Sequence, residues 1–261
     1  MIEAKKSLGQ HWLNDENSLD LIVQAAQVKD NQLVVEIGPG TGHLTAKLLK
    51  ITEHLIAVEI DESLLNKLTN RFKKEIENGY LVLKNTDIRR FDFNALEKDY
   101  KIVANIPYYL TSYLIRLISE TDNQPLLAVL LIQKEVAQRL TEGPGKMSLL
   151  SIAAQLNFDV QTKEVVEAYL FEPAPKVDSQ IVVLERKPKK MFDDIDYQDF
   201  LKFISNCFIM KRKKLTNNLF RFFDKKIVNQ AFDKLKINKD VRPQDLDLNQ
   251  WHDLFLILGK K

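Results

Sequence analysis

The first half of the chain alternates short apolar runs with stretches in which apolar residues recur every three or four positions. The short runs have the length of buried strands, and the longer stretches have the period of amphipathic helices. The predicted strands cover residues 33–38, 54–60, 80–87, 101–106 and 126–132. Helices are predicted over residues 43–50, 62–76 and 111–120. This alternation predicts an α/β fold with a parallel sheet that has helices on both faces.

Two strand-like segments later in the chain have no predicted helix between them. They cover residues 158–168 and 179–187, and we interpret them as a hairpin that closes one edge of the sheet. A polar, charged stretch then predicts a linker over residues 187–196. Four amphipathic segments follow it, over residues 197–208, 213–223, 225–235 and 248–258. We therefore expect an α/β domain over residues 1–188 and a small all-helical domain over residues 189–261.

Charge is distributed unevenly between these two predicted domains. The 261 residues carry a formal net charge of only +2. Residues 1–188 hold 22 Lys and Arg against 26 Asp and Glu, whereas residues 189–261 hold 16 against 10. The basic C-terminal part predicts an anionic partner for that domain.

Several classes of protein are disfavoured by the composition. The single cysteine, Cys207, excludes an internal disulfide and a cysteine-cluster zinc site, and the four histidines lack metal-ligand spacing. The longest apolar run, residues 126–132, is far too short to span a bilayer. The N-terminus lacks the apolar core of a signal peptide. We therefore expect a cytoplasmic protein with no metal and no membrane partner.

A glycine-rich loop follows the first predicted strand. The sequence EIGPGTG, residues 36–42, places Gly38, Gly40 and Gly42 just before a predicted helix. Glycines there allow a sharp turn and the close approach of a ligand, and the N-terminus of the helix favours an anionic group. The spacing differs from the G-x-G-x-x-G fingerprint, which weakens a nicotinamide cofactor without removing it as an alternative. An ordinary strand-to-helix turn is the structural alternative.

Acidic residues end the next two predicted strands. Glu59 lies 21 residues after Gly38 and can accept hydrogen bonds from both hydroxyls of a ribose. Asp87 can accept a hydrogen bond from an adenine amine, although either acid could simply cap a helix. Because the carboxyl ends of parallel strands meet at one edge, these residues predict a pocket for an adenosine-bearing ligand. S-adenosylmethionine is such a ligand, with its methionine carboxylate near the glycine loop.

The fourth predicted strand ends in the sequence NIPY, residues 105–108. The exocyclic amine of adenine is a poor nucleophile because its lone pair is delocalised into the ring. The Asn105 carboxamide oxygen and the Ile106 carbonyl could accept its hydrogens and aim the lone pair at a methyl donor. Pro107 would fix the position of that carbonyl, and Tyr108 could stack on a base taken out of its helix. The alternative is a simple turn followed by aromatic packing.

Together these motifs resemble the ribosomal RNA adenine dimethyltransferase family. NIPY, EIGPGTG and AVEID carry the resemblance first. KKSLGQHWLND at residues 5–15 is similar to the family's cofactor-covering segment, and FEPAPKVDS at residues 171–179 matches its F-x-P-x-P-K-V-x-S motif. FIMKRKKLTNNL at residues 208–219 resembles the basic helix that opens its C-terminal domain, and VRPQDLDLNQW a later part of that domain. The resemblance covers nearly the whole chain and implies a Rossmann-like S-adenosylmethionine-dependent methyltransferase fold.

The resemblance also implies roles for particular residues. Matching the motifs position by position puts the cofactor contacts on His11, Leu13, Gly38, Glu59, Asp87 and Asn105. Contacts to the target base fall on Asn105, Tyr108 and Phe171. RNA binding falls on Lys211, Arg212, Lys213 and Lys214, for which a solvated face is the alternative. The chain departs from the family pattern at His11 and Tyr109, where Asn is common, and at Met147, in a run where the family often has Gly-Arg-Leu-Ser.

Within the family, the KVDS and VRPQDLDL matches favour the small-subunit branch. That branch implies dimethylation of two adjacent adenosines near the 3′ end of 16S rRNA, on an immature small ribosomal subunit, by a monomeric enzyme. One alternative is the large-subunit enzyme of the macrolide-resistance type, which shares the glycine loop and NIPY. Another is an assembly factor that acts mainly by binding and release. A DNA adenine methyltransferase is disfavoured, because nothing in the chain resembles a module that reads DNA sequence.

Overall fold

The computed structural model describes residues 5, 8–29 and 31–259. The chain divides into two compact units. The first comprises Met1–Gln138 and Phe158–Arg186, and the second comprises Arg139–Asn157 and Lys187–Lys261. Each unit has a hydrophobic core of its own.

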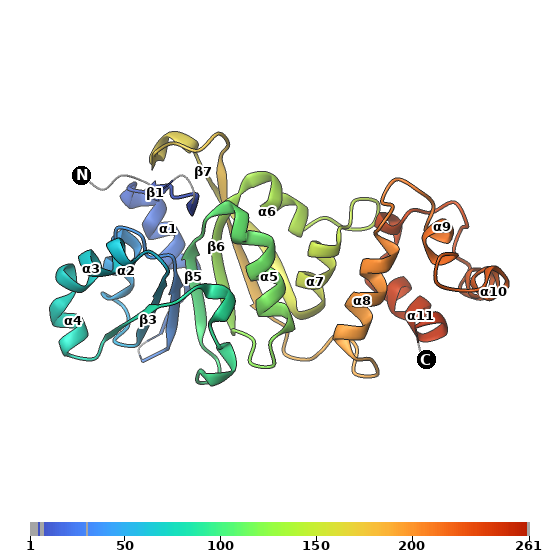
Figure 1. Cartoon of the computed structure of the whole chain (residues 1–261), viewed down its shortest axis with the longest axis horizontal. Helices are drawn as coiled ribbons and strands as arrows, with labels where there is room; N and C mark the ends of the chain where they lie inside the picture. Colours follow the sequence, from blue (N-terminus) through green and yellow to red (C-terminus); the bar gives the residue numbers. More distant parts are fainter. Residues whose placement is uncertain (1–4, 6–7, 30, 260–261) are drawn as a thin grey trace. The chain divides into compact units, whose positions relative to one another are not determined.

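A seven-stranded sheet forms the centre of the first unit (Figure 1). Its strands are β2 (Val34–Ile37), β3 (Leu55–Glu59), β4 (Leu81–Asn85), β5 (Lys101–Asn105), β6 (Leu127–Gln133), β7 (Phe158–Val166) and β9 (Ser179–Arg186). They lie in the order β4-β3-β2-β5-β6-β9-β7, in which the first five run parallel and β9 pairs antiparallel with both β6 and β7. The predicted parallel sheet and the hairpin at its edge are both confirmed.

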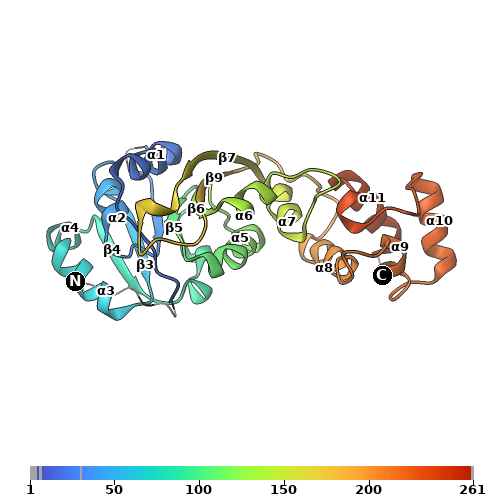
Figure 2. The ribbon, with the colours of Figure 1, turned by 90° about the horizontal axis from the view of Figure 1, so that it is seen from above.

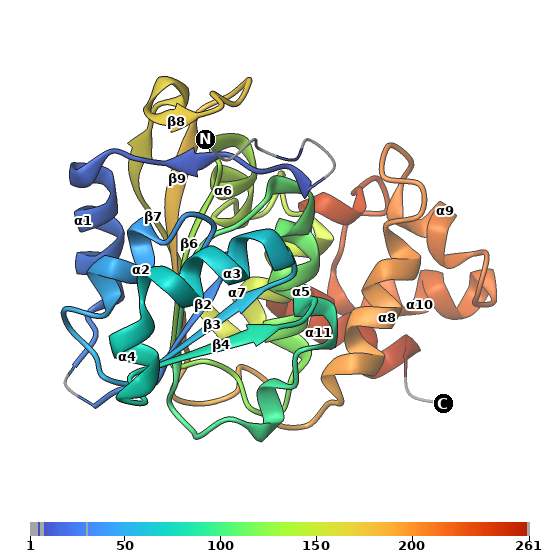
Figure 3. The same cartoon turned by 60° about the vertical axis from the view of Figure 1, so that its left-hand side comes forward.

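Helices cover both faces of the sheet. The chain moves from β2 towards one edge through β3 and β4, and it then returns to the other side of β2 to form β5 and β6. The helices of the first unit are α1 (Glu16–Ala26), α2 (His43–Leu48), α3 (Glu62–Arg71), α4 (Lys73–Glu77), α5 (Thr111–Glu120) and α6 (Lys134–Leu140). Right-handed crossovers place α2 and α3 on one face and α5, which follows β5 in the opposite direction, on the other. Figure 3 shows α2 and α3 in front of the strands, and Figure 2 shows α1 and α5 on opposite sides of β5 and β6.

The core beneath α1, α2 and α3 follows directly from strand alternation. Every second residue of a strand points to the same face, so Val34, Ala57 and Val103 all face these helices. Leu19 and Leu48 contribute the helical side of the same buried cluster. This packing fixes the strands rigidly, and their carboxyl ends therefore hold the following loops in defined positions.

Two short strands lie outside the main sheet. β1 (Trp12–Leu13) pairs antiparallel with β8 (Phe171–Glu172), and Leu13 is opposite Phe171. The pairing joins segments that are more than 150 residues apart in the chain. It brings the family-like segments KKSLGQHWLND and FEPAPKVDS side by side.

The second unit is entirely helical in its regular structure among the described residues. It contains α7 (Leu149–Asn157), α8 (Tyr197–Cys207), α9 (Leu215–Leu219), α10 (Lys225–Leu235) and α11 (Leu248–Leu258). Trp251 is fully buried at its centre, and Phe255 packs edge-on against Phe200 and Phe203 with ring centroids 5.2 and 5.5 Å apart. The four predicted helices are present, although the second is reduced to α9.

The structural division differs from the predicted boundary in one segment. Residues 139–157, which the sequence pattern places in the first domain, belong to the second compact unit. The reason is the apolar face of α7, where Ile152 and Leu156 share a buried cluster with Phe200 and Ile204 of α8. Amphipathic spacing predicts that such a face is buried but does not identify the element that buries it.

Candidate active site

A pocket opens at the carboxyl ends of β2, β3, β4 and β5. Its lining includes seven of the predicted site residues: His11, Leu13, Gly38, Glu59, Asp87, Asn105 and Tyr108. Phe171 does not belong to this lining, because its side chain is buried in the core cluster that also holds Leu13. The fold therefore brings together residues from four separate strand ends and from the N-terminal segment.

The glycine loop is tightly built. Gly40 and Gly42 both have positive φ, of 57° and 84°. A Cβ atom on Gly40 would lie 3.0 Å from the Trp12 ring, and one on Gly42 would lie 2.7 Å from Phe72. The loop therefore requires glycine for both conformation and space. This arrangement leaves the backbone of Gly38 and Gly40 on the pocket wall.

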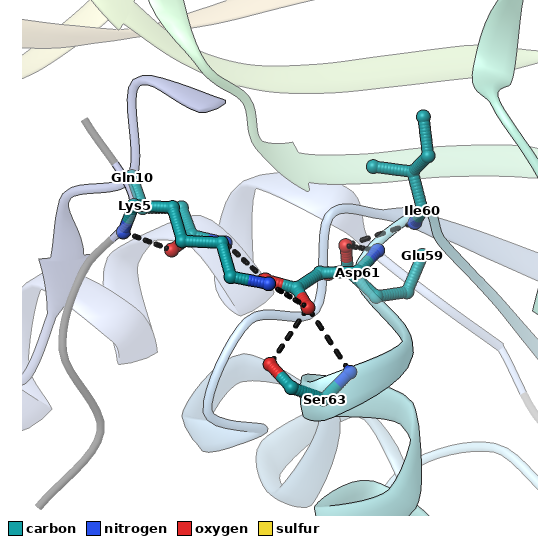
Figure 4. Close-up of polar contacts among 6 residues, drawn as sticks. All are labelled: Lys5, Gln10, Glu59, Ile60, Asp61 and Ser63. Carbon is teal, nitrogen blue, oxygen red and sulfur yellow. Dashed lines mark hydrogen bonds and ion pairs between the residues drawn. The ribbon is translucent and has the colours of Figure 1, made fainter. Parts of the chain in front are cut away.

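Glu59 ends β3 as a buried carboxylate (Figure 4). Its Oε1 accepts hydrogen bonds of 2.9 Å from the backbone N–H groups of both Ile60 and Asp61. Burial raises the pKa of Glu59, and the backbone hydrogen bonds of Asp61, Gly40 and Ile60 act against that rise. Each carboxylate oxygen has more than one lone pair, so Glu59 can still accept hydrogen bonds from the hydroxyls of a ribose.

Asp61 ties the start of the chain to this strand end. Its carboxylate accepts from Lys5 Nζ at 2.7 Å and from Gln10 Nε2 at 3.2 Å, and it also caps α3 through Ser63 (Figure 4). Burial alone would raise the pKa of Asp61, but the hydrogen bonds from Lys5, Ser63 and Gln10 lower it to about 2. Asp61 thus holds the N-terminal strap, residues 8–13, over one side of the pocket.

The strap also contacts the end of β5. Asn105 Nδ2 donates a hydrogen bond of 3.2 Å to the carbonyl of His11, and His11 Nδ1 lies 2.6 Å from the carbonyl of Pro173. The His11 ring stacks on Tyr108, with centroids 5.8 Å apart and planes inclined by 23°. The strap therefore links the glycine loop, the NIPY segment and the FEPAPKVDS segment.

Asp87 is engaged by a neighbouring arginine. It caps the short helix η2 (Ile88–Arg90) through Arg89 N, and its carboxylate also forms an ion pair with the Arg89 side chain. The hydrogen bonds from Arg89 lower the pKa of Asp87. The carboxylate is thus a charged acceptor on the pocket wall, and Arg89 also lines the pocket.

The NIPY segment turns directly into a helix. Pro107, with φ of −55°, precedes the short helix η4 (Tyr108–Leu110), which leads into α5. The Tyr108 hydroxyl lies 2.8 Å from Ser179 Oγ, a contact in which either atom can donate, and burial raises the pKa of Tyr108. The Tyr108 ring is therefore held at both its hydroxyl and its face, next to Asn105.

Glu36 is a pocket residue that the sequence analysis did not single out. Its side chain is almost completely buried, and Oε2 has no hydrogen-bond partner among the described residues. Burial, reinforced by the charge of Glu59, raises the pKa of Glu36 to about 8. Its position, two residues before Gly38 in EIGPGTG, is the signal that could have identified it.

These observations test whether S-adenosylmethionine fits the pocket. The ligand is a ribonucleoside that bears a sulfonium and an ammonium group. The lining supplies three carboxyl groups, from Glu36, Glu59 and Asp87, and Glu36 Oε2 is an unpaired buried oxygen. Acidic acceptors around a glycine loop complement a cationic, hydroxyl-rich ligand, so the residues fit the cofactor.

The predicted RNA-binding residues lie in the second unit. Lys211, Arg212, Lys213 and Lys214 are exposed and occupy the turn between α8 and α9 rather than the helix that the resemblance implied. Lys214 caps α9 and pairs with Asp240. The Asn218 side chain makes two hydrogen bonds with the backbone of Met210, the residue just before this basic turn. These contacts hold the chain so that the turn presents the charges of Lys211, Arg212 and Lys213 to solvent.

Two further expectations concern chemistry outside the pocket. The described residues contain no group of three His, Cys, Asp or Glu side chains that could bind a metal ion. In the same part of the chain, none of the helices has the length and apolar character needed to cross a membrane. Cys207 is buried, and burial raises the pKa of its thiol, which makes it unreactive.

Comparisons with known proteins agree with this geometry. A curated protein of Mycoplasmopsis synoviae, named Ribosomal RNA small subunit methyltransferase A, is 41% identical over 98% of this chain and 97% of its own. A solved dimethyladenosine transferase from Plasmodium falciparum is 29% identical, with a TM-score of 0.80 over 94% of this chain and 96% of that one. The 23S rRNA methyltransferase ErmE is 24% identical, with a TM-score of 0.74 over 95% and 100%, and this likeness shows the fold alone.

The family match extends over residues 1–260 and has the description Ribosomal RNA adenine dimethylase. It includes both compact units and every residue of the candidate site. The match therefore covers the α/β sheet, the pocket at its carboxyl edge and the C-terminal helical unit. The chain belongs to the ribosomal RNA adenine dimethylase family.

Proposed function

We propose that this protein dimethylates two adjacent adenosines near the 3′ end of small-subunit (16S) rRNA, with S-adenosylmethionine as the methyl donor. Its substrate is the immature small ribosomal subunit, so that it acts in ribosome biogenesis. The curated relative at 41% identity is named for methylation of small-subunit rRNA, and it matches this chain from end to end. We expect the protein to work as a monomer in the cytoplasm.

The observation that carries the proposal is the position of Asn105 beside Tyr108. Both residues line the pocket that contains the glycine loop and Glu59. Asn105 Nδ2 donates a hydrogen bond to the carbonyl of His11, which orients the carboxamide, and among the described residues Oδ1 has no donor and is available as an acceptor. An acceptor and an aromatic ring at the end of β5 suit the amine and the face of an adenine.

S-adenosylmethionine, when bound, supplies an electrophilic methyl group. Asn105 Oδ1 and the Ile106 carbonyl accept hydrogen bonds from the target amine, which localises its lone pair on nitrogen. Tyr108 stacks on the base and holds it in the orientation that the transfer requires. The chain needs no strong general base, because the amine loses its proton after the nitrogen has become cationic.

Cofactor and target-base binding use the remaining predicted residues. Glu59 accepts from the ribose hydroxyls, Asp87 from the adenine amine of the cofactor, and Gly38 with Leu13 forms the wall of the pocket. The strap covers the cofactor through His11 and excludes water from the methyl group. Phe171 supports the strap from beneath through the pairing of β1 with β8, and reaches the target base only if it leaves the core.

The basic turn in the second unit binds the RNA backbone. Lys211, Arg212 and Lys213 are exposed cations in a region with an excess of basic residues. Phosphate contacts of this kind add affinity without reading sequence. The division of labour is then catalysis in the first unit and RNA binding in the second.

Two alternatives are weaker. The large-subunit enzyme of the macrolide-resistance type is represented by ErmE, whose identity of 24% is far below that of the curated small-subunit relatives. An assembly factor that acts mainly by binding is compatible with enzyme activity. A catalytically inactive variant and a deletion distinguish these roles, since equal growth defects indicate that catalysis is the main one.

Methylation mapping tests the proposed function directly. Unmethylated small subunits are incubated with the protein and labelled S-adenosylmethionine, and the modified bases are located in the rRNA. We expect dimethyladenosine at two adjacent positions near the 3′ end. Label in large-subunit rRNA, or no label in either subunit, would contradict the proposal.

A further inference from the structure

Two exposed tyrosine side chains lie four residues apart in the chain, and one of them is at the rim of the pocket. Tyr109 is 59% exposed and Tyr113 is 41% exposed. Tyr109 lies in η4 and Tyr113 follows it by four residues in α5, so the two rings occupy similar faces of a continuous helical segment. Tyr109 also belongs to the pocket lining, directly after Tyr108. Exposed aromatic surface beside a binding pocket is typical of a surface that contacts a ligand.

Arg89 lies beside the pocket and in the neighbourhood of these rings. Arg89 lines the pocket, is paired with Asp87 and leaves most of its side chain in solvent. The pKa of Arg89 is raised first by its hydrogen bonds to Asp87, and Tyr109 and Tyr113 add to this electrostatically. The Tyr113 hydroxyl is 3.4 Å from the backbone carbonyl of Arg89, at the long limit of a hydrogen bond. Arg89 thus adds a positive charge to the same stretch of the pocket rim.

The strap packs against one side of the Tyr109 ring. Gly9 has a positive φ of 58°, and a Cβ atom there would lie 3.4 Å from Cδ1 of the Tyr109 ring. One part of the ring therefore packs against the Gly9 backbone while most of its surface stays in solvent. A ring that is held in place loses little entropy when a second ring stacks on it.

We propose that Tyr109, Tyr113 and Arg89 form a rim platform that binds the single-stranded purine nucleotide next to the target adenosine. The neighbouring base stacks on Tyr109, and Arg89 lies near the phosphate that joins the two nucleotides. This inference rests on the proposed function, because it assumes that one adenosine enters the pocket beside Tyr108.

Connectivity argues for this occupant. A nucleotide that enters the pocket leaves its helix, so the base next to it loses a stacking partner. The two nucleotides are joined by one phosphate, which confines the second to the rim. Aromatic rings and arginine planes are the groups on which unpaired bases stack in RNA-binding proteins. The platform therefore replaces the stacking that the neighbour loses.

The platform also suits a reaction on two adjacent adenosines. Stacking uses the face of a base and needs no hydrogen bond from its amine, so it tolerates both adenine and dimethyladenine. The protein can therefore hold one adenosine on the platform while the other is methylated, in either order. Tyr109 is also one of the positions at which this chain departs from the family pattern, where Asn is common.

Steady-state methylation of unmethylated small subunits, with saturating S-adenosylmethionine and varied subunit concentration, tests the platform. The variants are Tyr109→Ala, Tyr109→Leu and Tyr109→Phe, and Tyr80→Ala serves as a control for an exposed tyrosine outside the pocket lining. We expect the alanine and leucine variants to raise the half-saturating subunit concentration on the order of tenfold, with a smaller change in the maximal rate. Tyr109→Phe and Tyr80→Ala should match the wild type.

Three outcomes would overturn the platform. The first is a half-saturating concentration within twofold of the wild type for both Tyr109→Ala and Tyr109→Leu. The second is an equal loss in Tyr109→Phe, which would assign the effect to the hydroxyl group rather than to stacking. The third is an equal loss in Tyr80→Ala, which would mean that the effect is not specific to the rim. Failure of the proposed function itself looks different, because the wild type would then not methylate small subunits at all.

Discussion

The side-chain amide of Asn105 donates a hydrogen bond to the backbone carbonyl of His11, across 3.2 Å and 94 positions of the chain. The contact joins the end of β5 to the strap and determines which end of the carboxamide is free. Because Nδ2 has a protein acceptor, Oδ1 is the atom that can accept hydrogen bonds from an amine in the pocket. The strap thus orients Asn105 as well as covering the pocket.

Replacing Glu59 should weaken cofactor binding. Glu59→Gln keeps an acceptor for the amides of Ile60 and Asp61 but removes the negative charge that strengthens bonds to a ribose. We expect a loss of about 1.5–3 kcal/mol in binding of S-adenosylmethionine, measured by titration calorimetry, with little change in RNA affinity. Glu62→Ala, an exposed acid three residues later, is the control. Unchanged affinity in Glu59→Gln would show that the ribose assignment is wrong.

Releasing the tether of the strap should have a smaller effect. Lys5→Met removes the ion pair to Asp61 and leaves the Gln10 bond in place. A partly exposed hydrogen bond contributes about 0.5–1.5 kcal/mol, so the dissociation constant for S-adenosylmethionine should rise by a few-fold. Lys50→Met, at an exposed lysine that forms no ion pair with the described residues, should bind as the wild type does. If Lys5→Met binds S-adenosylmethionine as tightly as Lys50→Met does, the ion pair between Lys5 and Asp61 does not contribute to cofactor binding.

Glu36 should make the stability of the protein depend on pH. Its pKa in the folded state is about 8 and its ordinary value is 4.5, so the folded protein binds this proton more tightly than the unfolded chain does. The contribution to stability is therefore complete below about pH 4.5 and is lost as the pH rises toward 8. Between about pH 5 and pH 7.5 the loss amounts to about 3 kcal/mol.

Glu36→Gln provides the comparison, because glutamine is neutral throughout this range. Denaturant unfolding at the two pH values should show the variant gaining stability relative to the wild type as the pH rises. A difference between the two proteins that does not change with pH would mean that Glu36 is ionised when folded. Glu53→Gln, at an exposed glutamate, is the control and should follow the wild type.

Replacing two exposed lysines of the basic turn should weaken RNA binding in a salt-dependent way. Lys211 and Lys213 are the lysines to change, since Lys214 already pairs with Asp240. Two substitutions by Gln should flatten the log–log dependence of binding on salt by roughly one unit for each lost phosphate contact. Binding of S-adenosylmethionine should be unchanged. The same changes at Lys73 and Lys74 in α4 are the control. If the salt dependence has the same slope in both double variants, the basic turn does not contact the RNA and is a solvated surface.

Much of the fold could be predicted because its signals are local. The five parallel strands have apolar runs of strand length, and α10 and α11 begin and end where their amphipathic stretches do. The pocket was also predictable, since Gly38, Glu59 and Asn105 each lie at the carboxyl end of a recognisable strand and parallel strands share one carboxyl edge. These inferences need no knowledge of contacts between distant segments.

The features that were missed depend on long-range packing. The contacts of Asp61 with Lys5 and Gln10 join positions more than 50 residues apart, and no spacing rule connects them. The burial of Phe171 follows from the pairing of β1 with β8, and two-residue strands leave no periodic signal. Helix α1 is a different case, because its Asp15 cap and its buried positions Leu19, Ile22 and Ala26 are local signals, yet no helix is predicted between the strap and the first strand of the sheet.

The central claim is that Asn105 aims the amine of the target adenine, and single-turnover methylation tests it most directly. The experiment compares the wild type with Asn105→Ala and with Asn85→Ala, a control at the exposed end of β4. Each protein reacts with unmethylated small subunits at saturating S-adenosylmethionine. Monomethyladenosine and dimethyladenosine are measured separately. We expect Asn105→Ala to be slower by about two to three orders of magnitude. The second methylation should suffer at least as much as the first, because a monomethylated amine has one hydrogen left, and Asn85→Ala should react normally. Near wild-type rates for Asn105→Ala would contradict the mechanism and would mean that the NIPY segment is only a turn.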